Sequence, residues 1–174
     1  ETELSYIQSE INHLLNGIHE GASRTAEIVK GLRVFSRLDE DTWKPADINE
    51  GLKSTIAITA NLMRGITLDL QLTELPLVTC YPGKINQIFL NIITNAIYAI
   101  HKHHGNDVGG TLTIKSYHQE EAVFISIKDD GIGMDEVTKS KLFDPFFTTK
   151  PVGEGTGLGM SIVFSILEKH NAKC

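Results

Sequence analysis

The sequence predicts an α+β fold in which a compact unit of helices and short strands follows one long helix. Residues 1 to about 38 contain no proline and place apolar residues at alternating steps of three and four, a helical pattern. Residues 82–100 again show helical spacing, with apolar side chains recurring on one face. Before and after this second helix, residues 66–81 and 111–129 carry the alternating or proline-bounded segments that are typical of short strands.

The first predicted helix, over residues 1–38, would be roughly 55 Å long at 1.5 Å per residue. Its apolar seam begins with Leu4, Ile7, Ile11, Leu14 and Ile18. A helix of this kind cannot bury its apolar stripe alone, so it requires a partner helix from this chain or from a second copy. Residues 39–46 are charged and contain Pro45, which predicts a linker to the compact unit.

The compact unit is predicted to begin at Asp47, whose carboxylate suits the N-cap of a helix over residues 48–63. Four strands are expected, at residues 66–72, 75–81, 111–117 and 122–129, the last two as a hairpin. Residues 101–110 are polar and rich in glycine and predict a loop. After residue 129 the regular pattern stops for about 25 residues, a length that indicates a functional loop. An apolar helix over residues 161–170 follows.

The central helix, over residues 82–100, has two distinct faces. The residues expected to face the core are Ile85, Ile88, Phe89, Ile92, Ala96, Ala99 and Ile100. Gln87, Asn91 and Asn95 form another stripe, although asparagine is a poor helix former. An amide offers an oxygen to a cation and an N–H to an anion, so paired amides suit a metal-bound phosphate. The alternative, an amide pair that holds a nearby loop, is equally compatible with this helix alone.

Two glycine-rich motifs flank the irregular segment. Asp129-Asp-Gly131-Ile-Gly133 follows the last strand, where a carboxylate can accept a hydrogen bond from an exocyclic amine and the glycines allow a flat ligand to approach. Taken alone, it is equally an ordinary Asp-Gly turn. Residues 153–160, Gly-Glu-Gly-Thr-Gly-Leu-Gly-Met, lead into the last helix and present N–H groups to a phosphate. Their spacing excludes both the P-loop and the dinucleotide-binding Rossmann motif.

Composition and charge exclude several classes of protein. A chain of 174 residues with 41% hydrophobic composition can bury a core and is not disordered. The net charge of -6 argues against a nucleic-acid surface, which needs a basic stripe. Cys80 and Cys174 predict neither a disulfide framework nor a zinc site and fit a reducing compartment. No apolar run approaches the roughly 20 residues of a membrane span, so we expect a cytoplasmic location, with any membrane anchor outside these residues.

Four motifs in order closely resemble the catalytic ATP-binding domain of sensor histidine kinases of two-component systems. They are Asn91-x-x-x-Asn95, Asp129-x-Gly131-x-Gly133, Phe143-Asp-Pro-Phe-Phe-Thr-Thr-Lys150 and Gly155-Thr-Gly157-Leu-Gly159. The resemblance covers residues from about 47 to 170. It implies the Bergerat ATP-binding fold, a two-layer α/β sandwich shared with gyrase-type ATPases, ninety-kilodalton heat-shock chaperones and MutL-like repair proteins.

The resemblance implies that ATP and Mg²⁺ bind here. Asn95 matches the family's Mg²⁺ ligand, and Asn91 matches its neighbour that contacts phosphate and metal-bound water. Asp129 matches the carboxylate that receives the adenine amino group. Gly131 and Gly133 match the floor under the base.

The resemblance also assigns roles in the irregular segment. The turn that cradles the phosphates is matched by Gly155, Thr156, Gly157, Leu158 and Gly159. The aromatic residues that seat the lid over the nucleotide are matched by Phe143, Phe146 and Phe147. Thr148 and Lys150 match positions on the lid itself, and Lys150 is expected to bring positive charge to the β- and γ-phosphates.

The long helix resembles the second helix of the kinase dimerisation and phosphoacceptor hairpin, so the resemblance implies a homodimer through residues 1–38, a linker at 39–46 and a catalytic domain over 47–174. The phosphoacceptor context, like His-Glu-x-x-Asn-Pro, is absent from this sequence, and His19-Glu20 is its nearest imitation. We therefore expect a part of a longer kinase that binds nucleotide but phosphorylates itself little or not at all. Tyr98 departs from the family, because many relatives carry a charged residue there.

The resemblance implies that the intact protein moves the γ-phosphoryl of ATP to a histidine and then to an aspartate of a response-regulator receiver domain. Two other functions are weighed against this one. A non-kinase Bergerat-fold ATPase would carry a glutamate able to activate water where Asn91 stands. A pseudokinase would be a helical dimer scaffold with an empty pocket.

Overall fold

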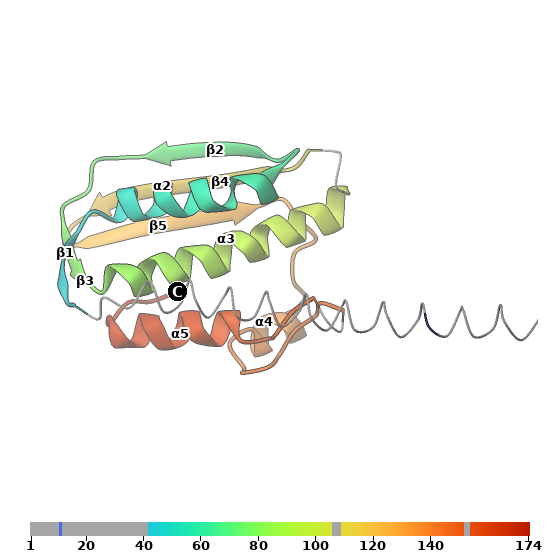
Figure 1. Cartoon of the computed structure of the whole chain (residues 1–174). Helices are drawn as coiled ribbons and strands as arrows, with labels where there is room; N and C mark the ends of the chain where they lie inside the picture. Colours follow the sequence, from blue (N-terminus) through green and yellow to red (C-terminus); the bar gives the residue numbers. More distant parts are fainter. Residues whose placement is uncertain (1–10, 12–41, 106–108, 152–153) are drawn as a thin grey trace, which may run out of the picture. The chain divides into compact units, whose positions relative to one another are not determined.

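The protein is described by a computed structural model, which covers residues 11, 42–105, 109–151 and 154–174. The chain divides into two units, Glu1–Asp39 and Glu40–Cys174. The predicted helix over residues 1–38, which includes His19, lies outside the described residues apart from Ile11. The second unit is the body of helices and strands in Figure 1.

The second unit contains the elements that the sequence predicts and some that it does not. In order they are β1 (Lys44–Ala46), α2 (Ile48–Thr59), the 3₁₀ turn η1 (Ala60–Met63), β2 (Thr67–Leu72), β3 (Val78–Cys80), α3 (Pro82–His104), β4 (Thr111–Gln119), β5 (Ala122–Asp129), α4 (Glu136–Lys141) and α5 (Gly159–Lys169). The predicted N-cap of α2 is confirmed, because Asp47 Oδ1 accepts a hydrogen bond from the Glu50 N–H at 3.1 Å. Among the described residues, the helices lack the combination of length and apolar composition that crossing a bilayer requires.

The strands form two sheets. In the larger sheet the order is β2-β4-β5, with β2 parallel to β4 and β4 antiparallel to β5. A parallel pair needs a crossover connection, which the segment containing β3 and α3 supplies. β1 and β3 form a separate antiparallel pair. The predicted hairpin is confirmed as β4 and β5.

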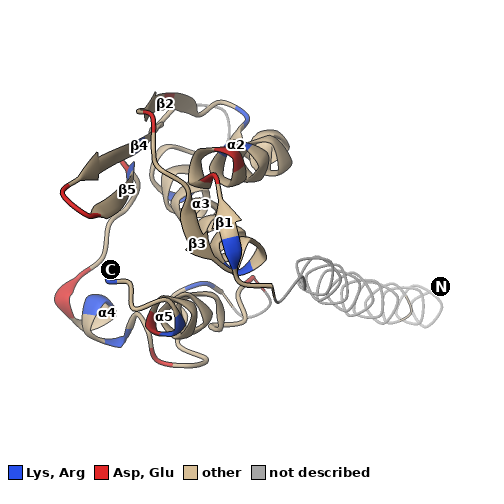
Figure 2. Ribbon diagram, turned by 90° about the vertical axis from the view of Figure 1, so that its left-hand side faces the viewer, with Lys and Arg blue, Asp and Glu red and all other residues tan. Residues whose placement is uncertain are grey.

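The helices α2 and α3 lie against one face of the larger sheet, and α5 lies beyond α3 (Figures 1 and 2). The burial of β4 alternates accordingly, because Leu112, Ile114 and Ser116 are buried while Lys115 and Tyr117 on the other face are exposed. The predicted fold class, an α/β sandwich of two layers, is confirmed.

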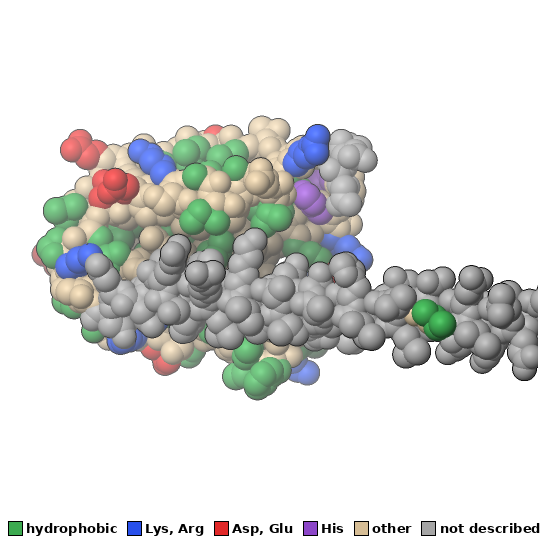
Figure 3. All heavy atoms as spheres, in the orientation of Figure 1, with side chains coloured by type: hydrophobic (Ala, Val, Ile, Leu, Met, Phe, Trp, Pro, Cys, Tyr) green, Lys and Arg blue, Asp and Glu red, His purple; other side chains and the backbone are tan. Residues whose placement is uncertain are grey.

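On the face seen in Figure 3, acidic and basic side chains are interspersed.

The core gathers around α3. The side chains that are completely buried include Leu52 of α2, Ile93 and Ile100 of α3, Leu112 and Ile114 of β4 and Val163 of α5. Ile93 and Ile97 are buried although they lie outside the predicted core stripe, because α3 packs against helices as well as the sheet. Ala99, which the sequence predicts in the core, is half-buried and faces a loop described below.

The structure corrects the boundaries of two segments that were predicted from the sequence. Residues 101–104, predicted as the start of a loop, form the last turn of α3, which ends at Gly105 with a φ of 83°. The basic side chains of this turn interact favourably with the negative end of the helix dipole. Lys44–Ala46, predicted as linker, forms β1, in which Pro45 is tolerated because the strand lies at a sheet edge.

The irregular segment after β5 also contains a helix that the sequence does not predict. α4 is short and begins at Asp135, whose Oδ1 accepts the Thr138 N–H at 2.7 Å. Its six residues carry too few apolar positions for a periodic pattern to be recognised.

Candidate functional site

One face of α3 holds the candidate site together. Asn91, Asn95 and Ala99 are spaced four residues apart, so they lie one above another along about 12 Å of the helix. Each of the three contacts a different part of the irregular region: the start of α5, the segment before residue 151 and the turn after β5. The helix therefore brings the separate sequence motifs into one row.

Asn91 ties α3 to the start of α5. Its Nδ2 donates a hydrogen bond to the Gly159 carbonyl oxygen at 3.1 Å. Gly159 is the first residue of α5, at the end of the predicted phosphate turn. For this amide, the structure shows the loop-holding contact that was weighed as an alternative, and the contact positions the turn beside the helix.

Asn95 contacts the lysine of the third motif. Its Oδ1 accepts a hydrogen bond from Lys150 Nζ at 3.1 Å, and the same Nζ lies 4.4 Å from the centroid of the Tyr98 ring. The Lys150 N–H donates to Thr148 Oγ1 at 3.1 Å. Burial lowers the pKa of the Lys150 ammonium, and the nearby charge of Glu154 acts in the opposite direction.

Asp129 ends β5 in a turn that lies directly on α3. Its Oδ1 accepts the Gly131 N–H at 3.0 Å, and the Ile132 N–H donates to the Ala99 carbonyl at 3.2 Å. A Cβ at Gly131 would overlap both the backbone and the side chain of Ala99, so only glycine fits this approach. Gly133 has open space around it, and its φ of 67° is the feature that favours glycine there.

The neighbouring Asp130 has a different role. Its Oδ1 accepts the Thr111 N–H at 2.9 Å and lies 3.2 Å from His104 Nε2. The hydrogen bond from Thr111 and the proximity of His104 hold the pKa of the Asp130 carboxyl below its usual value. Asp130 thus connects the end of β5 to the start of β4 and the end of α3, whereas Asp129 borders the site.

The third motif supplies both packing and backbone. The Phe143 ring lies 5.3 Å from the ring of Phe164 in α5. Phe146 has a φ of 66° and a side chain that is 74% exposed, so it contributes its backbone rather than its ring. Gly157, with a φ of 68°, lies so close to the Phe146 backbone that a Cβ would overlap it. Gly155 lies against Thr148, because a Cβ there would be 2.9 Å from Thr148 Oγ1.

The N-cap residue of α5 makes no side-chain capping hydrogen bond. Thr156 Oγ1 accepts the Leu158 N–H at 3.4 Å, and Leu158 is the N-cap residue of α5 without a side-chain cap. The N–H groups of the first turn are therefore not occupied by a capping side chain. This is the arrangement that binds phosphate at a helix N-terminus.

Several contributors to the site were not anticipated from the sequence. Tyr98, noted only as a departure from the family, forms a seat for Lys150. Ala99 provides the surface on which Gly131 lies. Their positions three and four residues after Asn95 were the available signal, because such residues share one helix face.

The donor groups at the site suit a Mg²⁺ ion that is shared with a bound phosphate, rather than one held entirely by protein ligands. Among the residues that the structure describes, no group of three or more His, Cys, Asp or Glu side chains could hold a metal ion. The Asn95 oxygen already faces a cation, Lys150, as a metal ligand must. Mg²⁺ commonly takes a small number of protein oxygens and completes its shell with phosphate and water, which suits this donor set.

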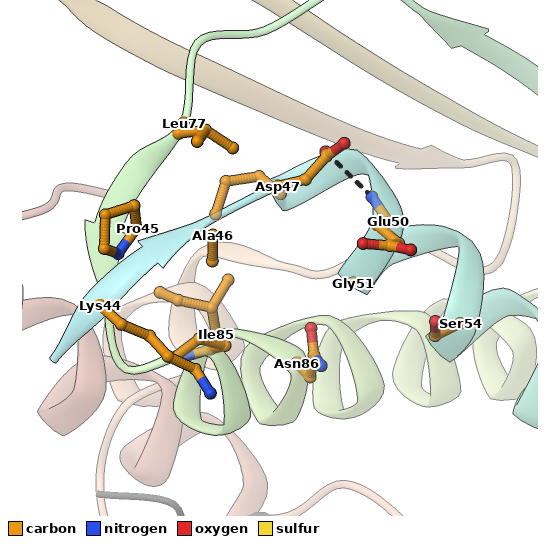
Figure 4. Close-up of a pocket in the computed structure, with 12 residues that line it drawn as sticks. Lys44, Pro45, Ala46, Asp47, Glu50, Gly51, Ser54, Leu77, Ile85 and Asn86 are labelled. Atoms are coloured by element: carbon orange, nitrogen blue, oxygen red, sulfur yellow. Dashed lines mark hydrogen bonds between the residues drawn. The ribbon is translucent and has the colours of Figure 1, made fainter. Parts of the chain in front are cut away.

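A cavity of about 470 Å³ lies elsewhere, between β1 and the first turns of α2 and α3 (Figure 4). Lys44, Ile85 and Asn86 line it, together with the capped start of α2. It contains none of the predicted site residues, and its lining mixes both charges with aliphatic groups. The cavity is therefore separate from the row of contacts on α3.

Comparison with known proteins identifies the family. Residues 81–174 match the family of histidine kinase-, DNA gyrase B- and HSP90-like ATPases. The chain belongs to this family. The matched region begins just before α3 and includes every contact of the candidate site.

The relatives are sensor kinases. Sporulation kinase E of Bacillus subtilis (strain 168) is 32% identical over 164 residues, which is 91% of this chain and 21% of that protein. The catalytic domain of histidine kinase ThkA has 28% identity and a TM-score of 0.63, covering 74% of this chain and 81% of that one. ThkA in complex with the response regulator protein TrrA has 27% identity and a TM-score of 0.64, covering 90% and 44%. The chain spans about a third or less of the length of the curated relatives it matches.

Proposed function

We propose that this chain is the ATP-binding core of a sensor histidine kinase, which moves the γ-phosphoryl of ATP to a histidine and from there to an aspartate of a response regulator. The observation that carries the proposal is the row of contacts on α3, from Asn91 through Asn95 to Ala99. One end of this row contacts the start of α5, which suits a phosphate, and the other end contacts the turn after β5, which carries a carboxylate. Family membership and the sensor-kinase relatives support it.

The base end of the site is assigned to Asp129. One oxygen of its carboxylate is held by the Gly131 N–H, which orients the group at the end of β5. In this proposal, the carboxylate accepts a hydrogen bond from the adenine amino group, and Gly131 forms the floor under the base. Guanine would present a carbonyl oxygen at that point, so ATP is favoured over GTP.

The phosphate end of the site is assigned to the amides and the start of α5. Asn95 would hold Mg²⁺ through Oδ1, and the N–H groups before Met160 would contact the phosphates. Mg²⁺, when bound, supplies charge neutralisation on the phosphate oxygens. Lys150 adds a further positive charge near the β- and γ-phosphates. Phosphoryl transfer depends mainly on positioning and charge neutralisation, which these groups provide.

The partners follow from the same proposal. The ThkA structure described together with TrrA supports a response-regulator receiver domain as the partner in the second transfer. A homodimer through residues 1–38 and a cytoplasmic location belong to the proposal as well. The resemblance of residues 20–37 to the hairpin helix of the family supports the dimer.

Calorimetric titration with Mg-ATP and Mg-GTP tests nucleotide binding. We expect ATP to bind and GTP to bind at least about tenfold more weakly, the effect of one lost hydrogen bond to a charged group. Millimolar or absent ATP binding would instead favour the pseudokinase scaffold. Equal affinity for the two nucleotides would contradict the role of Asp129.

Steady-state ATP turnover distinguishes a kinase core from a hydrolytic ATPase. Asn91 is an amide and cannot act as a general base, so we expect no multiple-turnover hydrolysis from this chain. The Asn91→Glu variant is the matched comparison, because a glutamate there can activate water. Multiple turnover by the unsubstituted chain at the level of that variant would favour the ATPase.

A further inference from the structure

Two different cations would bind the same side-chain oxygen of Asn95. In the structure it accepts a hydrogen bond from Lys150 Nζ at 3.1 Å. In the proposed function, on which this inference rests, the same oxygen binds Mg²⁺. An ammonium about 3 Å and a Mg²⁺ about 2 Å from one oxygen would lie within roughly 5 Å of each other and repel strongly.

We propose that Lys150 and Mg²⁺ exchange at Asn95, so that only one of them binds the amide oxygen at a time. The Tyr98 ring is the seat that holds the Lys150 ammonium while it is hydrogen-bonded to Asn95. Tyr98 follows Asn95 by three residues, so its ring lies on the same face of α3. Lys150 Nζ lies 4.4 Å from the ring centroid while it donates to the amide oxygen. The ammonium is thus held by a ring face and an oxygen together.

The exchange also reaches the phosphate turn. A Cβ at Gly155 would be 3.0 Å from Lys150 Cδ and 2.9 Å from Thr148 Oγ1, so Gly155 lies against the stem of the lysine. Thr148 in turn accepts the backbone N–H of Lys150. When the ammonium leaves Asn95, the side chain against which Gly155 lies therefore moves as well. Tyr98 is therefore a positioning residue for the nucleotide site.

The chain contains a matched control for this contact. Lys169 Nζ lies 4.3 Å from the centroid of the Tyr81 ring, nearly the same distance. Tyr81 directly precedes α3, whereas the site surrounds residues 91–99. The Lys169 contact should therefore respond to ring removal in the same way but not to nucleotide.

The first experiment is NMR of the 174-residue chain with ¹³C-labelled lysine side chains. Protons above an aromatic face resonate upfield, so the ε-methylene signals of Lys150 and Lys169 are expected upfield in buffer with Mg²⁺ alone. Lys150→Met and Lys169→Met assign the two signals. Adding ATP with Mg²⁺ should return the Lys150 signal to its ordinary position and leave the Lys169 signal in place.

The second experiment measures how much Mg²⁺ is needed for half-maximal strengthening of ATP binding. Tyr98→Leu removes the ring seat, so this Mg²⁺ concentration should fall about two- to fivefold, the range for one cation–π contact. Tyr98→Phe keeps a ring and should behave as the unsubstituted chain does. Tyr81→Leu removes a ring at the control site and should also leave the value unchanged.

The outcomes separate this inference from the proposed function. If ATP binds while the Lys150 signal stays upfield, or if Tyr98→Leu matches Tyr98→Phe, the exchange is wrong and the nucleotide site stands. If ATP does not bind at all, both the proposed function and the exchange are overturned. Movement of both lysine signals on ATP binding would point to a general rearrangement and would also contradict the exchange.

Discussion

The start and the interior of α3 carry similar lysine–ring contacts with different consequences. At its start, Lys169 lies over Tyr81, and in its middle Lys150 lies over Tyr98, at 4.3 and 4.4 Å. The contact at the start belongs to a cluster of rings, whereas the one in the middle includes the amide oxygen of Asn95. A lysine over a ring is thus structural or exchangeable according to the other groups that the ammonium can reach.

A cluster of three rings, Trp43, Tyr81 and His170, lies at the start of α3. The His170 ring stacks on Trp43 with centroids 5.3 Å apart, and Tyr81 meets Trp43 edge-on at 4.9 Å. His170 Nε2 accepts the Tyr81 N–H at 3.1 Å, so Nδ1 carries the proton that faces the Ile166 carbonyl at 2.7 Å. This cluster joins the segments next to β1, β3 and α5.

The largest expected effect comes from Asp129, at the end of β5. Asp129→Asn keeps an oxygen for the Gly131 N–H but loses the charge that the adenine amino group would meet. ATP affinity should fall roughly 10- to 100-fold, the worth of a hydrogen bond to a charged group. Calorimetry measures the affinity, and thermal unfolding should show little change.

Asp130→Ala is the matched control, because this carboxylate contacts Thr111 and His104 rather than the site. It should lower the melting temperature and leave ATP affinity unchanged. Should Asp130→Ala weaken ATP binding as much as Asp129→Asn does, the assignment of the adenine contact to Asp129 would be wrong.

A stability effect without a functional one is expected from Trp43. Trp43→Ala removes its contacts with Tyr81 and His170, which should lower the free energy of unfolding by about 1–2 kcal/mol. Urea unfolding followed by circular dichroism measures this change. ATP affinity should be unaffected, because the cluster lies away from the row of contacts on α3. Trp43→Phe keeps a stacked ring and should recover most of the loss.

The regular elements could be predicted because each contains enough residues for a repeating pattern. α3 shows helical spacing over several turns, and β4 and β5 alternate as a hairpin. β1 has only three residues in a charged segment, and its pairing with β3 depends on residues far along the chain. Its composition alone could not reveal that pairing.

The candidate site could be predicted motif by motif, but not contact by contact. Spacing placed Asn91 and Asn95 on one face of α3, and a strand ending in Asp129 placed the carboxylate. The Lys150 to Asn95 contact joins residues 55 positions apart, and only the folded loop brings them together. The different roles of Asp129 and Asp130 were equally hidden, because they depend on which backbone N–H each one meets.

The smallest expected effect is a pH dependence that again separates these two carboxylates. The Thr111 N–H and His104 hold the pKa of Asp130 below its ordinary value of 3.8, so this group adds stability above that pH and loses it as the pH falls through the lower value. The unfolding midpoint of the unsubstituted chain should therefore exceed that of Asp130→Asn at neutral pH, and the gap should close as the pH falls from neutral to below 3.8. Denaturant titrations of both proteins across this range measure the gap. A gap that widens toward acid would mean that the folded protein favours the protonated carboxyl, which contradicts the hydrogen bond from Thr111.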